Sequence, residues 1–210
     1  QRHVRMSLHV IDDDFRHDDT VKDIFLNIFK HKNLVFSQLN LMNALGVLGQ
    51  FLPVFGRIVG RMQYDLFHMY TVDQHTLFVV RNIRQIFLED DSHPLAHKVA
   101  GQFKRPYVLH LAGFFHDIGK GRGGDHSELG AEEARVFAAE FNLPKADGQL
   151  LVWLVKHHLV MSVVAQKQDI NDPAVIKRFA ELVRRQRYLD ALYILTIADI
   201  EGTDPKLWNS

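Results

Sequence analysis

Two adjacent side chains at the end of an apolar run are the strongest chemical signal in this sequence. The run from Tyr107 to Phe115 ends in His116 and Asp117, and Lys120 follows shortly after. Burying an imidazole beside a carboxylate is costly unless a partner compensates both groups. A divalent cation is such a partner, because it binds a neutral imidazole and an ionised carboxylate together. The alternative interpretation is a core histidine that forms a hydrogen bond with its neighbour.

Further candidate ligands recur along the chain, each at or near the end of a predicted helix and on or beside an apolar face. Independent core histidines could account for one or two of them, but bundle cores build metal sites from facing helices, so convergence on one or two ions accounts better for the whole set. Adjacent helical residues point about 100° apart, so His116 and Asp117 share one ion only at a helix edge; alternatively, Asp117 bridges two ions. The other candidates are His75, His126, His157 or His158, and Asp199.

The segment from Lys120 to Asp125 is rich in glycine and carries two cations. Because such a backbone is permissive, it can wrap closely around an anion, with Lys120 and Arg122 supplying charge. Asp125 is expected to cap the helix that follows. A second pair of cations, Arg57 and Arg61, could approach a phosphate, although we expect a solvated helix face there.

The elements that position these side chains are all predicted to be helices. Apolar residues recur at helical spacing, and almost nothing alternates with the period of two that is typical of a strand. We therefore expect an all-α fold, a helical bundle with a metal site at its centre. Ile24 is placed on an apolar helix face and Leu41 is placed inward, Thr71 or Asp73 is expected to cap a helix, and Asp172 with Pro173 is a strong helix start. The predicted helices span residues 20–29, 34–48, 71–88, 107–117, 127–141, 147–158 and 189–200, with others from 53, 95 and 173.

Composition limits the chemistry further. The 210 residues can form one large domain or two small ones. The chain has no cysteine, so a metal site must use imidazole and carboxylate groups, which favours Mn, Fe, Zn, Co or Mg over a thiolate cluster. The 25 Lys and Arg residues balance the 25 Asp and Glu residues, so no overall field attracts nucleic acid or an anionic membrane.

We expect no apolar run to reach the length of a membrane span. The longest candidate, residues 39–59, is interrupted by Asn43, Gln50, Pro53 and Arg57. No signal peptide or internal repeat is recognised. The chain begins at Gln1 and ends at Ser210 without a tail, so we expect an excised piece of a longer protein.

The order of the candidate ligands resembles that of the HD superfamily of metal-dependent phosphohydrolases, over roughly residues 64–200. Longer segments resemble one branch, the bifunctional uridylyltransferase/uridylyl-removing enzymes that act on the PII nitrogen-signalling protein. This closer resemblance extends from about residue 50 to the end. The segments that carry it are residues 55–65, 70–76, 116–130, 158–166, 198–200 and 205–210.

The resemblance implies a domain organisation. Residues 1–50 are expected to be a helical connection from a preceding domain, and residues 51–210 an HD phosphohydrolase domain. In this branch a nucleotidyltransferase domain precedes the HD domain and two ACT domains follow it. The resemblance also implies a cytoplasmic location, without a nucleic-acid or membrane partner.

The resemblance further implies a role for each candidate. One metal site would use His75, His116, Asp117 and Asp199; the other would use His126 and His158. His158 is favoured over His157 because only His158 stands in the His-Leu-x-Met-Ser frame. The implied catalytic residues are His116, Asp117 and Lys120, and the implied substrate-binding residues are Lys120 and Arg122.

The implied reaction is hydrolysis of the phosphodiester that joins UMP to a tyrosine hydroxyl of uridylylated PII. One or two divalent ions (Mn, Mg, Fe or Zn) would lower the pKa of water and hold a phosphoryl oxygen. One alternative is an HD phosphohydrolase for a free nucleotide or alarmone; a cyclic di-GMP phosphodiesterase is less favoured, because no Gly-Tyr-Pro segment follows His158. The other alternative is a catalytically silent regulatory module with a structural metal.

Overall fold

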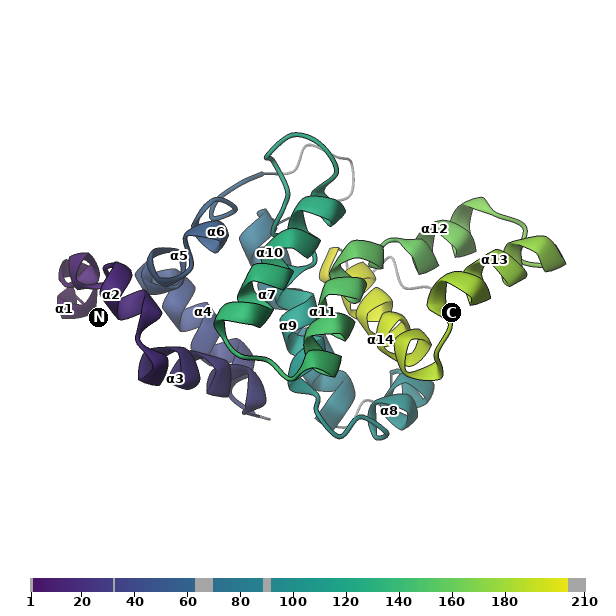
Figure 1. The fold of residues 1–210 in the computed structure, drawn as a ribbon, viewed down its shortest axis with the longest axis horizontal. Helices are drawn as coiled ribbons and strands as arrows, with labels where there is room; N and C mark the ends of the chain where they lie inside the picture. The colour runs from purple at the N-terminus through teal and green to yellow at the C-terminus, as the bar shows by residue number, and fades with distance from the viewer. Residues whose placement is uncertain (1, 32, 63–69, 89–91, 204–210) are drawn as a thin grey trace.

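The computed structural model describes residues 2–31, 33–62, 70–88 and 92–203, and these residues confirm the all-α prediction. Two stretches discussed above lie partly or wholly outside the described residues, namely residues 63–65 of segment 55–65 and all of segment 205–210. The molecule is elongated: the first helices gather at one end, a bundle occupies the middle, and α12 and α13 extend from the other end (Figure 1).

The middle bundle is built around α9 (Tyr107–Phe115), all of whose residues are buried. It lies among α7 (Val72–Leu88), α10 (His126–Glu140), α11 (Lys145–His157) and α14 (Gln186–Thr203), as Figure 1 shows. An apolar surface on all sides is typical of a helix that is surrounded by others. Burying each large apolar side chain here contributes about 1.5–3 kcal/mol. The predicted bundle core is therefore confirmed, with α9 as its central helix.

The N-terminal helices are shorter and pack on one side of this bundle through α3 and α4. Asp12, in an acidic triplet, accepts a hydrogen bond from the Phe15 N–H (2.9 Å) and so caps a helix. The elements of this part are α1 (Arg2–Met6), a 3-10 turn (Leu8–Val10), α2 (Asp13–His17), α3 (Asp19–Lys30), α4 (Val35–Leu45), α5 (Val47–Phe51) and α6 (Pro53–Gly56).

The predicted helix over residues 34–48 is wrong in its extent. It breaks at Gly46, whose φ of +80° is a left-handed conformation that ends α4 and lets α5 start in a new direction. The inward placement of Leu41 is also wrong, because Val35 and Leu39 define the buried face and Leu41 is 44% exposed. Ile24 is likewise 61% exposed, since Phe25 and Phe29 hold the core face of α3.

Three further helices complete the fold. α8 (Pro94–Ala100) and α13 (Pro173–Val183) start where they were predicted, and Asp172 caps α13 by accepting the Ala174 N–H (2.8 Å). α12 (Val160–Lys167) was not predicted. None of its residues is fully buried and Met161 packs only partly against the core, so its apolar periodicity is weak.

One stretch of the described chain, Lys145–Lys167, is long and apolar enough to cross a membrane by length and composition alone. The expectation that no run reaches such a length was therefore wrong. The stretch comprises α11, a turn at residues 158–159 and α12. α11 packs on α9 and α10, and a core helix of this kind meets the same criterion.

Candidate metal centre

The candidate ligands come from the ends of five helices that meet in the bundle. His75 lies in the first turn of α7, and His126 is the first residue of α10. His116 caps the C-terminus of α9, His158 caps α11, and Asp199 lies toward the end of α14. Helices so far apart in sequence converge here because each buries an apolar face against α9 or its neighbours. Asp117, which follows His116 directly, is also buried.

Backbone carbonyls orient two of the imidazoles. The Nδ1 atom of His116 lies 2.7 Å from the Gly113 carbonyl oxygen, and that of His158 lies 2.8 Å from the Val155 carbonyl oxygen. In each case Nδ1–H donates to the carbonyl, so Nε2 is directed toward the cluster. This is the arrangement that fixes a metal-binding histidine in one orientation.

One group of donors surrounds the Oδ2 side of Asp117. His75 Nε2 lies 3.1 Å from His116 Nε2 and 2.9 Å from Asp199 Oδ1. His75 Nε2 and His116 Nε2 lie 3.5 and 3.2 Å from Asp117 Oδ2. Two ligands on neighbouring corners around an ion with bonds of about 2.1 Å are themselves about 3 Å apart. His75, His116 and Asp117 therefore have the spacing that a single cation requires, and Asp199 lies beside the two imidazoles.

A second group surrounds the Oδ1 side of the same carboxylate. His126 Nε2 and His158 Nε2 lie 3.7 and 3.8 Å from Asp117 Oδ1. Both nitrogens are buried and have no hydrogen-bond partner among the described residues. A buried nitrogen without a partner is costly. The donor set of Asp117, His126 and His158 fits a second cation, with Asp117 between the two groups.

The electrostatics of the cluster favour a positive charge at its centre. Burial alone would lower the pKa of His116, but Asp117 and Asp199 outweigh it and raise that pKa to about 10. Although burial opposes it, His116 and Lys120 hold the pKa of Asp117 well below its usual range. Burial and the nearby His116 charge lower the pKa of His158 to about 4, so this imidazole is neutral and can donate a lone pair. The cluster thus stabilises a bound proton when no ion is present, and a cation can replace that proton.

The two cations predicted on the glycine-rich loop are placed differently. Lys120 Nζ lies 2.7 Å from Asp117 Oδ2, so the lysine belongs to the centre. Arg122 instead forms an ion pair with Glu133 of α10, on the flank of the loop. Asp125 caps α10 as predicted, accepting the Ser127 N–H at 2.8 Å. The structure therefore brings Lys120, but not Arg122, to the ligand cluster.

His157 lies apart from the cluster, although it is adjacent to His158. Its ring contacts Trp153, with centroids 5.0 Å apart, and it is only partly buried. Burial lowers its pKa. The geometry separates the two neighbours: only His158 faces Asp117.

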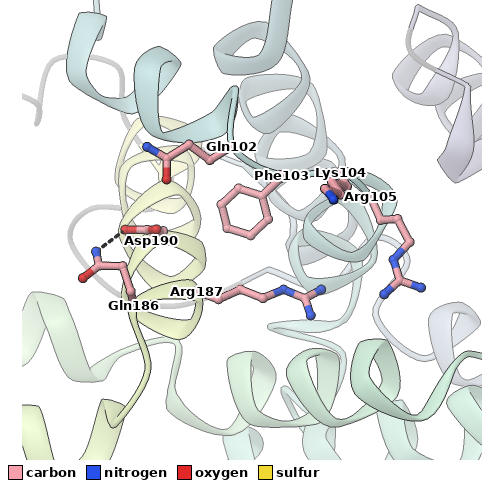
Figure 2. A pocket seen from close by; sticks show the side chains of 7 residues that line it. All are labelled: Gln102, Phe103, Lys104, Arg105, Gln186, Arg187 and Asp190. Atoms are coloured by element: carbon pink, nitrogen blue, oxygen red, sulfur yellow. Dashed lines mark hydrogen bonds between the residues drawn. The ribbon is translucent and has the colours of Figure 1, made fainter.

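A second buried carboxylate lies elsewhere in the bundle and was not anticipated. Asp147, in the first turn of α11, accepts a hydrogen bond from the Tyr107 hydroxyl (2.6 Å) and forms ion pairs with Arg105 (3.0 Å) and Arg187 (3.1 Å). Burial and Asp147 raise the pKa of Tyr107. These arginines line a cavity of about 620 Å³ between residues 102–105 and the start of α14 (Figure 2). No candidate ligand lines it, and its Asp190 is nine residues along α14 from Asp199, about 13 Å away.

Two family models match separate parts of the chain. A family model described as "HD domain" matches residues 72–201, and one described as "Uridylyltransferase GlnD third domain" matches residues 1–51. The HD match begins at the first residue of α7 and contains every candidate ligand.

Curated relatives are similar along the whole chain. Proteins named bifunctional uridylyltransferase/uridylyl-removing enzyme are 52% identical in Ectopseudomonas mendocina, 51% in Azotobacter vinelandii and 49% in Pseudomonas aeruginosa, each over 211 aligned residues and 100% of this chain. The chain spans about a quarter of the length of these relatives, 24%, 24% and 23%. The resemblance to this branch is therefore confirmed. A helical bundle with imidazoles and carboxylates at its centre, matched over most of its length, places this chain in the HD domain family.

Proposed function

We propose that this domain removes UMP from uridylylated PII by metal-dependent hydrolysis of the phosphodiester on a tyrosine of that protein. The relatives carry uridylyl removal in their names, and this chain contains an HD domain after the segment that matches the third domain of a uridylyltransferase. The observation that carries the proposal is the pair of buried, unpartnered nitrogens of His126 and His158 beside Asp117. Most buried nitrogens in a structural core are hydrogen-bonded, whereas these two converge on one carboxylate.

In this proposal His75, His116, Asp117 and Asp199 hold one divalent cation, and Asp117, His126 and His158 hold a second. The donor set contains only nitrogen and oxygen, which suits Mn, Mg, Fe or Zn. When bound, a divalent ion supplies Lewis-acid activation of water and neutralises phosphoryl charge. His116 and Asp117 are the proposed catalytic pair, because both touch the centre from one turn at the end of α9.

Lys120 is proposed both as a catalytic residue and as a substrate-binding residue. Its ammonium group lies 2.7 Å from Asp117 Oδ2 and so stands beside the reacting phosphoryl group, where it neutralises charge that develops on the phosphoryl oxygens. Arg122 was expected to help but pairs with Glu133, so we assign it a supporting role on the flank of the loop. The leaving group is a tyrosine phenolate with an ordinary pKa of about 10, so a strong general acid is not required.

The proposal extends to the organisation of the full-length protein. Residues 1–50 form the helical connection from a preceding nucleotidyltransferase domain, residues 51–210 form the hydrolase, and ACT domains follow. Uridylylated PII is the partner, and the reaction takes place in the cytoplasm without nucleic acid or membrane. The match of residues 1–51 to the third domain of a uridylyltransferase supports this order.

The direct test is turnover of uridylylated PII by the full-length enzyme. We expect His116→Ala and Asp117→Ala each to abolish release of UMP while circular dichroism and the unfolding midpoint show a folded domain. A panel of free nucleotides and an alarmone should show no comparable turnover with the unaltered enzyme. Full activity in either variant would refute the assignment. Bound metal without turnover in the full-length enzyme would favour the regulatory alternative.

A further inference from the structure

We propose that Arg61 binds a phosphoryl oxygen of the substrate beside the metal centre, in the role that the sequence suggested for Arg122. This inference rests on the proposed function and adds a residue to it. It is carried by a close approach between two segments far apart in the chain, Arg61 and the glycine-rich loop.

The guanidinium group of Arg61 lies directly on Gly121. A Cβ atom at residue 121 would occupy the same space as the guanidinium carbon and two of its nitrogens. Gly121 also has a φ of +77°, which side chains rarely adopt. Its neighbour Lys120 contacts Asp117 at 2.7 Å. The guanidinium group of Arg61 therefore lies on the residue that follows Lys120, the lysine that contacts the ligand cluster.

The main chain around Arg61 is fixed to the helix that carries a metal ligand. The Arg61 carbonyl accepts the N–H of Val72 at 2.9 Å, where α7 begins, three residues before His75. The next residue, Met62, forms an isolated β-bridge with Thr71. The expected solvated helix face is wrong here, because α6 ends at Gly56 and Arg61 lies in the turn before this bridge.

A buried carboxylate holds the same turn from inside. Asp73 is 4% exposed and accepts the Gly60 N–H at 2.9 Å and the Asn43 Nδ2–H at 2.8 Å. Hydrogen bonds to an ionised, buried group are among the stronger ones in proteins. Thr71 or Asp73 was expected to cap α7; the contacts of the Asp73 carboxylate are tertiary ones, which tie residue 60 to α4 and α7.

The charge of Arg61 is available to an anion. Arg61 is exposed, and within the described ranges no carboxylate lies at ion-pair distance from it. Arg122, on the same loop, is paired with Glu133. A guanidinium group offers planar, paired N–H donors that match two oxygens of a phosphate. Arg61 therefore combines a fixed position, an uncompensated charge and proximity to Lys120.

The test compares four variants of the full-length enzyme in matched pairs. Arg61→Gln removes the guanidinium group under test. Arg57→Gln removes a nearby exposed guanidinium group that lines a cavity beside α10. Gly121→Ala displaces the guanidinium of Arg61 without altering it. Gly123→Ala imposes the same backbone strain, at φ +75°, but its Cβ meets nothing within 4 Å. Binding of UMP and of inorganic phosphate is measured by calorimetry with Mn²⁺ present, together with kcat and KM on uridylylated PII.

We expect Arg61→Gln and Gly121→Ala to weaken UMP and phosphate binding by about 10- to 100-fold, as loss of a hydrogen bond to a charged group would. Arg57→Gln and Gly123→Ala should change binding less than twofold. Arg61→Lys should restore part of the affinity, and the Mn²⁺ content of every variant should equal that of the unaltered enzyme.

Equal binding by Arg61→Gln and Arg57→Gln, or equal losses in Gly121→Ala and Gly123→Ala, would overturn the proposal. Loss of bound Mn²⁺ in Arg61→Gln would also overturn it, because the arginine would then serve to build the centre. The binding measurements do not require uridylylated PII. Failure of the unaltered enzyme to release UMP from PII would therefore reject the proposed function while the role of Arg61 is still decided by binding.

Discussion

Asp147 and Asp117 are both buried in the same bundle, yet their surroundings differ in kind. Asp147 is surrounded by donors that the protein supplies, two guanidinium groups and a phenol hydroxyl. Within the described part of the chain, Asp117 contacts one ammonium group and several imidazoles, and two of these imidazoles present nitrogens toward it that have no hydrogen-bond partner there. The first carboxylate is satisfied by the folded chain itself. The second is part of a set of lone pairs, which only a proton or a cation satisfies.

The groups around a buried carboxylate, rather than its burial, separate a structural role from a functional one. Asp147 ties together α11, the approach to α9 and α14, the same helices that carry ligands. Arginines that pair with a buried carboxylate hold the helices together, but they occupy its oxygens, so these oxygens do not bind a metal ion or a substrate. An imidazole can give up its proton to bind a cation, so the set around Asp117 can exchange the proton of His116 for a metal ion.

The largest effect should separate the two aspartates by stability. Asp147→Ala leaves the Tyr107 hydroxyl and two partly exposed guanidinium groups without their partner, so it should lower the free energy of unfolding by about 3 kcal/mol. Asp117→Ala should cost less than half as much in the metal-free protein, because the imidazoles around it can become neutral. Urea denaturation in EDTA measures both values. Equal losses would remove the distinction.

Addition of Mn²⁺ should make Asp117, rather than Asp147, the aspartate whose replacement lowers stability more. Mn²⁺ at about 100 times its dissociation constant should stabilise the unaltered protein by about 2.7 kcal/mol. For a chain of this size that raises the unfolding midpoint by roughly 5–10 °C. The shift should persist in an Asp147→Asn variant, measured from its own baseline, and vanish in Asp117→Asn. A shift retained in Asp117→Asn would show that the ion binds elsewhere.

As pH rises, the stability of the metal-free protein should fall while its affinity for Mn²⁺ should increase. The pKa of His116 is raised from 6.5 to about 10 by Asp117 and Asp199 against the effect of burial, so its contribution to stability is full below pH 6.5 and is lost as pH rises toward 10. A cation must displace that proton, so Mn²⁺ affinity should rise up to tenfold per pH unit over this range, about 1.4 kcal/mol. Titration calorimetry at pH 7 and 8 measures it; a flat profile would contradict the proton exchange.

The smallest effect should distinguish the adjacent histidines. His157→Ala changes a partly exposed ring on Trp153 and should alter stability by no more than about 0.5 kcal/mol, with metal content unchanged. His158→Ala should reduce bound Mn²⁺ from two ions to one per chain. Elemental analysis after gel filtration measures both. Identical metal content in the two variants would contradict the assignment of His158, rather than His157, as the metal ligand.

Features that depend on neighbours in sequence were predictable. A polar pair at the end of an apolar helix marks His116 and Asp117, and the caps at Asp125 and Asp172 follow from local hydrogen bonding. The helical period located α7, α9 and α14 because each has a face in the core. The candidate ligands were found for the same reason: each is a polar residue in an apolar context.

Features that depend on distant neighbours were not predictable. Asp147 looked like an ordinary first-turn residue, because its partners Tyr107 and Arg187 are each 40 residues away. The contact of Arg61 with Gly121 joins segments 60 residues apart. The break at Gly46 was missed because the apolar spacing continues across it and the left-handed turn depends on how α5 packs. Local periodicity records which side of a helix is buried but not what it meets.

The ligand cluster draws on the chain from residue 75 to residue 199, and this span has a consequence for folding. An ion that joins both ends acts as a removable cross-link across most of the bundle, so it can be held firmly only after α14 has docked. A chain growing on the ribosome would lack Asp199 until nearly the whole domain had been synthesised. Uptake of metal would therefore report completion of the fold rather than its beginning.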